Sequence, residues 1–252
     1  MVVILHYFKA QIQVLKNNIL LKSFYSNNKL KFKIFYLIIG VFFFIIICIK
    51  LFFYLDGIEE KREVINNFNY PRISPTEIAK IQEGDFILRR GFGFFSDVIA
   101  TQLNKAPFDV THAGIIVNDH GKWAVVHSLS SDVSKIDGIQ IQYLDEFLKY
   151  SQSNKIVITR FKSPSTNTNS QIAGLAKYHL KKKISFDHLG DFEDSTSMYC
   201  TELILHILNK DLKVLEIDKT KQEKQDFLFT MKKMYDTNYF KLVVNTYPPY
   251  KE

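Results

Sequence analysis

Cys200 is the residue in this sequence with the clearest potential for nucleophilic chemistry. The segment Ser195-Thr-Ser197 offers side chains that cap a helix, and Met198 to Leu208 then follows a helical pattern. Cys200 falls in the first turn of this predicted helix, on the face of its apolar residues. Unpaired N–H groups and the helix dipole lower the pKa of a thiol there, which favours the thiolate. A small buried residue that only packs is the equal alternative.

A thiolate nucleophile needs a base, and two of the seven histidines are placed to supply one. His112 and His127 flank a predicted turn, Asn118-Asp-His-Gly121, in two segments of β-branched character. A two-residue loop and a four-residue loop both keep these imidazoles on one face of an antiparallel hairpin. A three-residue loop breaks that parity unless a bulge restores it. Together with Cys200 they would form a nucleophile, a base and an orienting group.

The other histidines are weaker candidates for chemistry. His179 and His206 fall on predicted helices with no obvious partner, and His188 lies in a loop beside Asp187. We interpret five histidines as structural or solvated: His6, His120, His179, His188 and His206. The two cysteines are too few for a disulfide framework and lack the spacing of a zinc site, so no metal or organic cofactor is implied.

Short β-like segments, separated by clusters of Gly, Asn, Asp and Ser, would position these residues. The predicted strands are Asp85–Arg89, Thr111–Val117, Trp123–His127, Ile139–Gln142 and Lys155–Phe161. The predicted helices are Phe95–Leu103, Leu144–Tyr150, Gln171–Lys181, Ser197–Leu208 and Lys221–Met234. This order predicts an α+β fold, with an antiparallel sheet packed against helices. The sequence has no glycine-rich phosphate loop.

An apolar run from Ile34 to Leu55 predicts a transmembrane helix. It holds one charged residue, Lys50, and about 20 such residues cross a hydrocarbon layer of about 30 Å. Six lysines and no Asp or Glu occur up to Lys33, so this basic flank should stay in the cytoplasm and the C-terminal part should lie outside it. A cleaved signal peptide and a lipid-modified Cys48 both fit the sequence less well, because no small-residue cleavage site is present.

The charge distribution argues against a nucleic-acid partner. The 252 residues include 33 basic and 26 acidic ones, but nearly all of the excess lies in the N-terminal segment. A body of nearly balanced charge has no electrostatic footprint for phosphate backbones. The bilayer itself is the expected partner, and residues 2–21 are apolar enough to lie on its inner surface.

Four motifs resemble the permuted NlpC/P60 hydrolases of the YiiX/YebB type, which are papain-like enzymes. They are Glu83-Gly-Asp-Phe-Ile-Leu-Arg-Arg-Gly91, Thr111-His-Ala-Gly-Ile-Ile116, Phe186-Asp187 and Tyr199-Cys-Thr-Glu-Leu203. The resemblance covers roughly residues 80 to 210. It implies a hydrolase domain, which we place at 77–247. The apolar run and its flanks predict the three segments before it: a basic cytoplasmic tail (1–33), a transmembrane signal-anchor helix (34–55) and a linker (56–76).

The resemblance also implies roles for individual residues. Cys200 takes the place of the nucleophile, His112 that of the base, and His127 the orienting position. Close YiiX-type relatives tend to hold Glu there, whereas a second His is usual in the lecithin–retinol acyltransferase branch, which leaves the substrate class open. Tyr199 and Asp187 are weaker candidates for contact with the oxyanion or substrate.

Glu202 is a further polar residue beside the nucleophile. It lies two residues past Cys200, about 200° around the helix, so we interpret it as a structural partner of the backbone or of a lysine.

The sequence therefore predicts a membrane-anchored cysteine hydrolase that cleaves an amide bond. Its substrate would be a peptide, a cell-wall fragment or a lipid acyl group. Two alternatives stay open: a lipid acyltransferase or thioesterase of the same superfamily, and a non-catalytic papain-like binding module.

Overall fold

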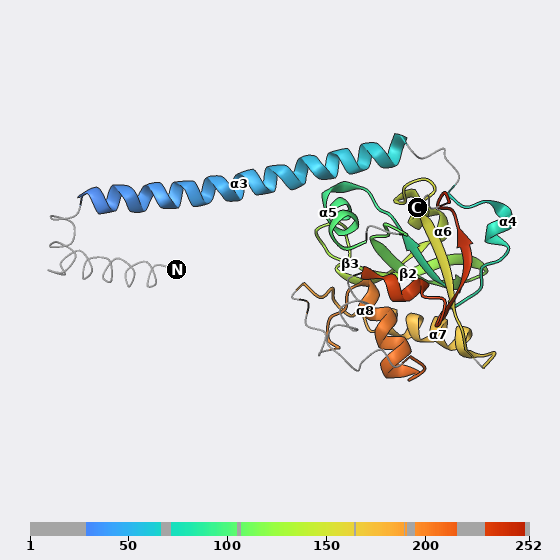
Figure 1. Ribbon diagram of the computed structural model, residues 1–252. Coiled ribbons are helices and arrows are strands. Elements are labelled where there is room, and N and C mark those ends of the chain that lie inside the picture. Colours follow the sequence, from blue (N-terminus) through green and yellow to red (C-terminus); the bar gives the residue numbers. More distant parts are fainter. Residues whose placement is uncertain are drawn as a thin grey trace. The chain divides into compact units, whose positions relative to one another are not determined.

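The chain forms two units, Met1–Leu55 and Asp56–Glu252. The computed structural model describes residues 29–66, 72–104, 107–163, 165–188, 190, 195–215 and 230–249 (Figure 1). His6, the segment 2–21 and most of the predicted helix Lys221–Met234 lie outside these residues.

The membrane-spanning prediction corresponds to one continuous helix, α3 (Lys29–Asn66). Its most apolar window has a mean hydropathy of 2.9 and none of it is buried, so length and composition suit a bilayer. The helix continues past Leu55 to Asn66, and the first part of the expected linker is therefore helical.

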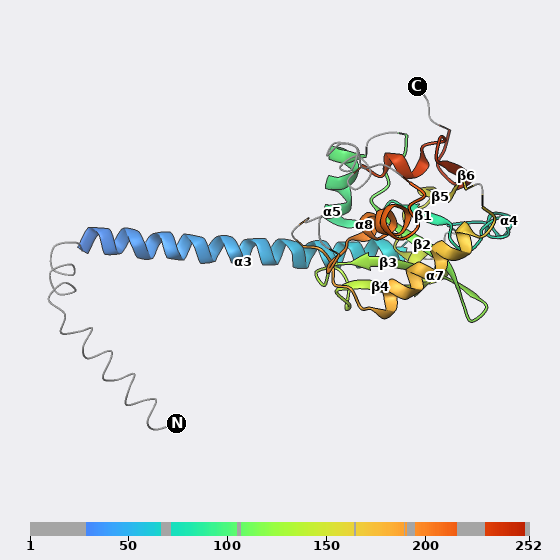
Figure 2. The ribbon, with the colours of Figure 1, turned by 90° about the horizontal axis from the view of Figure 1, so that it is seen from below.

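The second unit is built on a six-stranded antiparallel sheet in the order β4-β3-β2-β1-β5-β6 (Figure 2). The strands are β1 (Phe86–Arg89), β2 (His112–Asp119), β3 (Lys122–Leu129), β4 (Gly138–Tyr143), β5 (Ile156–Phe161) and β6 (Phe240–Asn245). The antiparallel α+β prediction is confirmed. The edge strand β6 was not predicted, although its run of Leu and Val is typical of a strand.

The hairpin between β2 and β3 turns at His120-Gly121. Asp119 pairs with Lys122 across the turn, and both turn residues have positive φ, 50° for His120 and 84° for Gly121. Positive φ at both central positions is the mark of the tight turn that suits strand twist, and Gly accepts it readily. The two-residue loop is therefore His120-Gly121, one residue later than Asp119-His120. The side chains of His112 and His127 still point to the same face of the sheet.

Helices cover both faces of the sheet. They are α4 (Pro75–Ile78), α5 (Gly93–Val98), α6 (Leu144–Lys149), α7 (Thr168–Lys181) and α8 (Cys200–Leu205). Two of them continue as π-helical segments, Ile99–Leu103 after α5 and η2 (His206–Asp211) after α8. A short 3₁₀ helix, Lys232–Tyr235, precedes β6.

The helix that carries Cys200 begins later than predicted. Ser197 forms a β-bridge with Ser185, and the Met198 N–H donates to the Ser185 carbonyl at 2.9 Å. These backbone contacts hold the chain extended up to Tyr199, whose ψ is 179°. The helix therefore starts at Cys200 itself.

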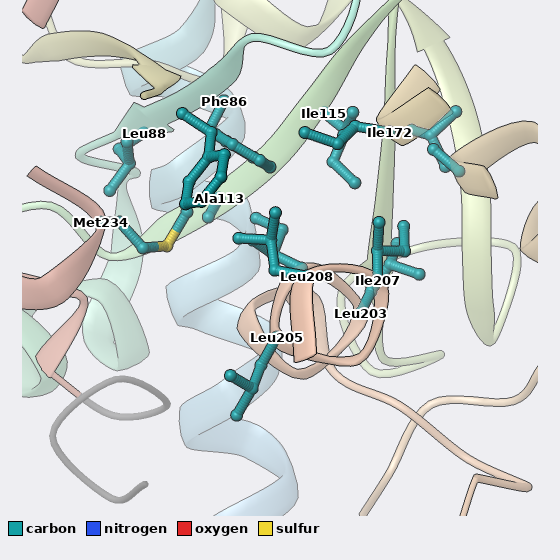
Figure 3. Close-up of a cluster of buried hydrophobic side chains, with 14 of the residues drawn as sticks. Phe86, Leu88, Ala113, Ile115, Ile172, Leu203, Leu205, Ile207, Leu208 and Met234 are labelled. Carbon is teal, nitrogen blue, oxygen red and sulfur yellow. The ribbon is translucent and has the colours of Figure 1, made fainter. Parts of the chain in front are cut away.

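Two apolar clusters lie on the two faces of the sheet. Alternate residues of β1, β2 and β3 pack against α7, α8 and η2, as Figure 3 shows for Leu88, Ala113 and Ile115 facing Leu203, Ile207 and Leu208. The intervening residues, among them Ile87, Ile116 and Val125, pack against Phe147 of α6 on the other face. The sheet is thus buried on both faces, where polar side chains are uncommon.

Candidate active site

Three polar side chains project from neighbouring strands on the α6 face of the sheet. Arg89 of β1 is the direct partner of His112 of β2, and His127 lies on the same face of β3 as Val125. His127 is fully buried, and Arg89 and His112 are 7% and 8% exposed. Charged and titratable groups are rarely buried without a partner. Their convergence beside the apolar cluster of this face marks a site.

The two histidines contact each other directly. Nε2 of His112 lies 2.9 Å from Nδ1 of His127, and the rings meet edge to face, 5.0 Å apart, both against Phe147. The predicted same-face arrangement of His112 and His127 is confirmed. Because Nε2 of His112 faces His127, its Nδ1 is the ring nitrogen left to serve another group.

Burial keeps both imidazoles neutral. It lowers the pKa of His112 well below its usual value, and the positive charge of Arg89 adds to this effect. For His127, burial and then Arg89 lower the pKa to about 3, while Gln142 of β4 acts in the opposite direction. An uncharged imidazole can accept a proton, which is the state that a general base requires.

Cys200 lies at the start of α8, which packs on the opposite face of the sheet, and its thiol interacts with the Ala113 N–H and with Arg89. Burial raises the pKa of its thiol, while hydrogen bonds from the backbone N–H groups of Ala113, Thr201 and Cys200 itself, together with the charge of Arg89, lower it. Ala113 directly follows His112, so the thiol lies beside the start of β2. The expectation of a net lowered thiol pKa is wrong: the helix-start N–H groups act in the predicted direction, but burial outweighs them.

Arg89 is the residue of this site that the sequence analysis missed. Its guanidinium lies 4.6 Å from the centre of the Phe147 ring and donates to the Tyr150 carbonyl. Burial lowers the pKa of Arg89 to about 10, so it stays charged at neutral pH. Its charge acts on His112, His127 and Cys200 alike. Arg89 ends a strand whose four residues are all buried, a property that the sequence alone does not show.

In the Thr-His-Ala-Gly motif, Thr111 and Gly114 have structural roles in addition to the role of His112. The hydroxyl of Thr111 accepts from the Gly91 N–H at 3.0 Å and lies 2.7 Å from the Ser96 hydroxyl, which ties β2 to the end of β1 and to α5. A Cβ on Gly114 would lie 2.4 Å from Val125 Cγ1 and 3.2 Å from His127 Cβ. Only glycine leaves room there for the side chain of His127.

The Glu-Gly-Asp motif is structural. Asp85 is fully buried and accepts two hydrogen bonds from Arg160, at 2.6 and 2.8 Å. Glu83 accepts from the Asn118 N–H at 2.8 Å and so supports the end of β2. The first contact joins the start of β1 to β5 and the second joins it to β2, and the β1–β2 register places Arg89 beside His112.

The two weaker candidates, Tyr199 and Asp187, and the polar Glu202 all have structural contacts. Tyr199 is half-buried against the core, and burial raises the pKa of its phenol. Asp187 is buried and accepts from the Gly190 N–H at 2.8 Å. Glu202 accepts from the Tyr199 N–H at 3.3 Å, which confirms its interpretation as a backbone partner.

Four of the remaining histidines lie within the described residues. His120 stands exposed at the hairpin tip, and His188 contacts Asp137 at 2.9 Å. His179 and His206, which have no obvious partner in the sequence, both approach Asp211. The π-helical turn that makes this possible is not visible in the spacing of the residues.

Two comparisons relate this chain to known proteins. Residues 80–243 match the model of the permuted papain-like amidase enzymes, the YaeF/YiiX or C92 family. A solved structure described as metalloprotein yiiX from Escherichia coli O157:H7 is 17% identical, with 67% of this chain and 99% of that chain covered and a TM-score of 0.49. No curated protein matches the chain. The chain belongs to the permuted papain-like amidase family.

Proposed function

We propose that this chain is a membrane-anchored cysteine amidase in which Cys200 is the nucleophile, His112 the general base and His127 the group that orients it. The observation that carries the proposal is the 2.9 Å contact between His112 Nε2 and His127 Nδ1, beside a thiol that accepts from the Ala113 N–H. Family membership supports a cysteine-hydrolase chemistry for the domain, which we take as residues 77–247.

The reaction starts from a neutral thiol and a neutral imidazole. As the sulfur of Cys200 attacks the carbonyl carbon, its proton passes to His112 Nδ1, and the C–N bond then breaks as His112 returns that proton to the leaving amine. Water next attacks the thioester, gives a proton to His112 and releases the acid, and Cys200 recovers its proton. His127 holds the ring of His112 in one orientation throughout.

The negative charge that develops on the carbonyl oxygen needs donors. The backbone N–H groups at the start of α8, which already point at the sulfur, are suitable donors. Arg89 adds a fixed positive charge in a buried setting, where it is screened less than in water. Tyr199 directly precedes the nucleophile, and substrate contact is its proposed role.

The proposed location follows from the apolar helix and its basic flank. Lysines are retained on the cytoplasmic side, so the hydrolase domain faces outward, where peptides and cell-wall fragments are natural substrates. A reporter fused at the C-terminus should be active outside the cytoplasm and inactive within it. Cytoplasmic reporter activity would contradict the orientation and the substrate class with it.

A second candidate function, acyl transfer or hydrolysis of a lipid ester, is favoured by an exposed apolar strip. The exposed apolar side chains of α5 and the turn after it are Phe94, Phe95, Val98 and Leu103, and the polar Asp97, Thr101 and Gln102 are exposed among them. Ser96 of the same helix lies 2.7 Å from Thr111, the residue before His112. Exposed apolar surface beside a site suits a lipid substrate, and a His-His-Cys set is usual in the acyltransferase branch.

Product analysis separates these functions. The full chain in lipid nanodiscs is incubated with a cell-wall peptide mixture and, separately, with phospholipid vesicles. New amine termini mark the amidase, whereas free fatty acid or a transferred acyl chain marks the lipid enzyme. Turnover of neither substrate class, together with an unmodified Cys200, would leave the non-catalytic binding module as the correct interpretation.

A further inference from the structure

Three side chains outside the proposed active site converge at the junction of α7 with η2. His179 Nε2 lies 2.7 Å from one oxygen of Asp211, and His206 Nε2 lies 3.6 Å from the other. The two imidazole rings are 5.1 Å apart, edge to face. One potential ligand atom from each residue falls within 4.8 Å of the other two.

The backbone adopts an uncommon conformation to bring two of these residues together. His206 and Asp211 are five positions apart, which in an α-helix would place them about 140° apart around the axis. They bound a π-helical segment, in which the Leu212 N–H donates to the Ile207 carbonyl five residues back, at 3.0 Å. A π turn nearly aligns residues at this spacing, and such turns are often found at functional sites.

The cluster borders a cavity of about 330 Å³. His179 and His206 both line it, together with the polar side chains of Ser185, Ser195 and Thr196 and with two lysines, Lys182 and Lys183. An ion held by the cluster would therefore have an open position facing the cavity. The lysines make that position suitable for an anionic ligand, such as hydroxide or a carboxylate.

We propose that His179, His206 and Asp211 bind a divalent transition-metal ion, with Zn²⁺ the best match. Two imidazoles and one carboxylate form a ligand set that suits zinc, whereas calcium and magnesium prefer oxygen ligands alone. Three protein ligands leave the fourth tetrahedral position for a ligand from the cavity.

The bound ion would join two helices that pack on the same face of the sheet. His179 lies near the end of α7, and His206 continues the helix that starts at Cys200. Metal binding that requires the folded state stabilises that state. The ion would thus link α7 to the helix that carries Cys200 and keep its fourth position open to the cavity, apart from the bond cleavage proposed at Cys200.

The test uses the full chain in detergent, freed of metal by a chelator and then given Zn²⁺ or Co²⁺. We expect one equivalent of tightly bound zinc, visible absorption typical of tetrahedral Co²⁺, and a higher thermal unfolding midpoint with metal. His206→Gln should weaken zinc binding by about 10-fold or more. Asp211→Asn keeps an oxygen beside His179 and should also weaken zinc binding. This second variant tests the site if His206→Gln does not fold.

Two control variants locate the ion. His188→Gln removes a surface histidine that pairs with Asp137 and should bind zinc normally. Cys200→Ser should also bind zinc normally. This variant tests the proposed active site, where the thiol of Cys200 and the imidazoles of His112 and His127 could hold zinc instead. Zinc lost in Cys200→Ser but kept in Asp211→Asn would overturn the proposal, as would a wild-type chain that binds no zinc.

Discussion

His112 Nε2 and His127 Nδ1 lie 2.9 Å apart, on a sheet face that they share with Arg89 and a cluster of apolar side chains. A contact of this length between two neutral rings requires a proton on one nitrogen and a lone pair on the other. If His112 donates, its Nδ1 carries the lone pair and can accept the proton of Cys200. The pair therefore sets the tautomer that a general base needs.

Substitution of His127 tests this division of roles. His127→Ala should lower turnover by about 10- to 100-fold, because the base loses its orienting partner but remains present. His127→Glu should retain more activity than Ala, since a carboxylate accepts the same N–H from His112. His120→Ala, at the exposed hairpin tip, is the matched control. Equal activity of the Ala and Glu variants would argue against an orienting role.

The pH dependence of Cys200 alkylation tests its electrostatic setting. Because burial raises the pKa of the thiol, iodoacetamide should label Cys200 slowly near pH 7 and faster as the pH rises above about 9. Arg89→Met should move that rise to higher pH and lower turnover by about 10-fold, whereas Arg89→Lys should preserve part of both. Cys200→Ser measures the background from Cys48. An alkylation profile unchanged in Arg89→Met would show that Arg89 does not act on the thiol.

A methyl group at Gly114 should disturb the strand pair that carries the histidines. Gly114→Ala should lower the free energy of unfolding by about 1–3 kcal/mol, because the new Cβ would clash with Val125 and crowd His127. Gly174→Ala is the control, since nothing lies within 4 Å of a Cβ there, and in helix α7 it should stabilise by about 0.5–1 kcal/mol. Chemical denaturation measures both changes. A neutral Gly114→Ala would mean that the strands can separate at little cost.

Stability should fall in acid partly because of the two histidines. Their pKa values are lowered in the folded state, so below about pH 6.5 the unfolded chain binds more protons than the folded chain. Their contribution is complete above pH 6.5 and is lost as the pH falls toward 3, the region of the folded pKa of His127. His127→Gln should therefore flatten the decline of the thermal midpoint between pH 7 and pH 4. A decline as steep as that of the wild type would contradict the burial argument.

The alternation of side chains between the two faces of a strand explains why much of the site was predictable from sequence. Side chains alternate along strands, so a short loop between His112 and His127 placed both imidazoles on one face without knowledge of the exact turn. Apolar spacing predicted a helix at Cys200, whereas the expected capping residues Ser195 to Ser197 precede Tyr199, the residue that occupies the N-cap position. The observed turn lies one residue after Asp119-His120 because His120 and Gly121 accept positive φ.

The missed features depend on contacts between distant parts of the chain. Arg89 became part of the site through its register with His112, which no local pattern specifies. The raised pKa of Cys200 depends on burial by the whole fold, and local helix chemistry gave the opposite expectation. The approach of His206 to Asp211 required a π turn, which sequence periodicity does not predict.

Intact-mass spectrometry of the full chain with candidate amide and ester substrates tests the central claim most directly. The account predicts a mass increase equal to the acyl group, located on Cys200 by peptide mapping, absent in Cys200→Ala and much reduced in His112→Ala. It also predicts that the adduct decays in water and releases the free acid. Substrate turnover that persists in Cys200→Ala, or an acyl adduct on another residue, would contradict it.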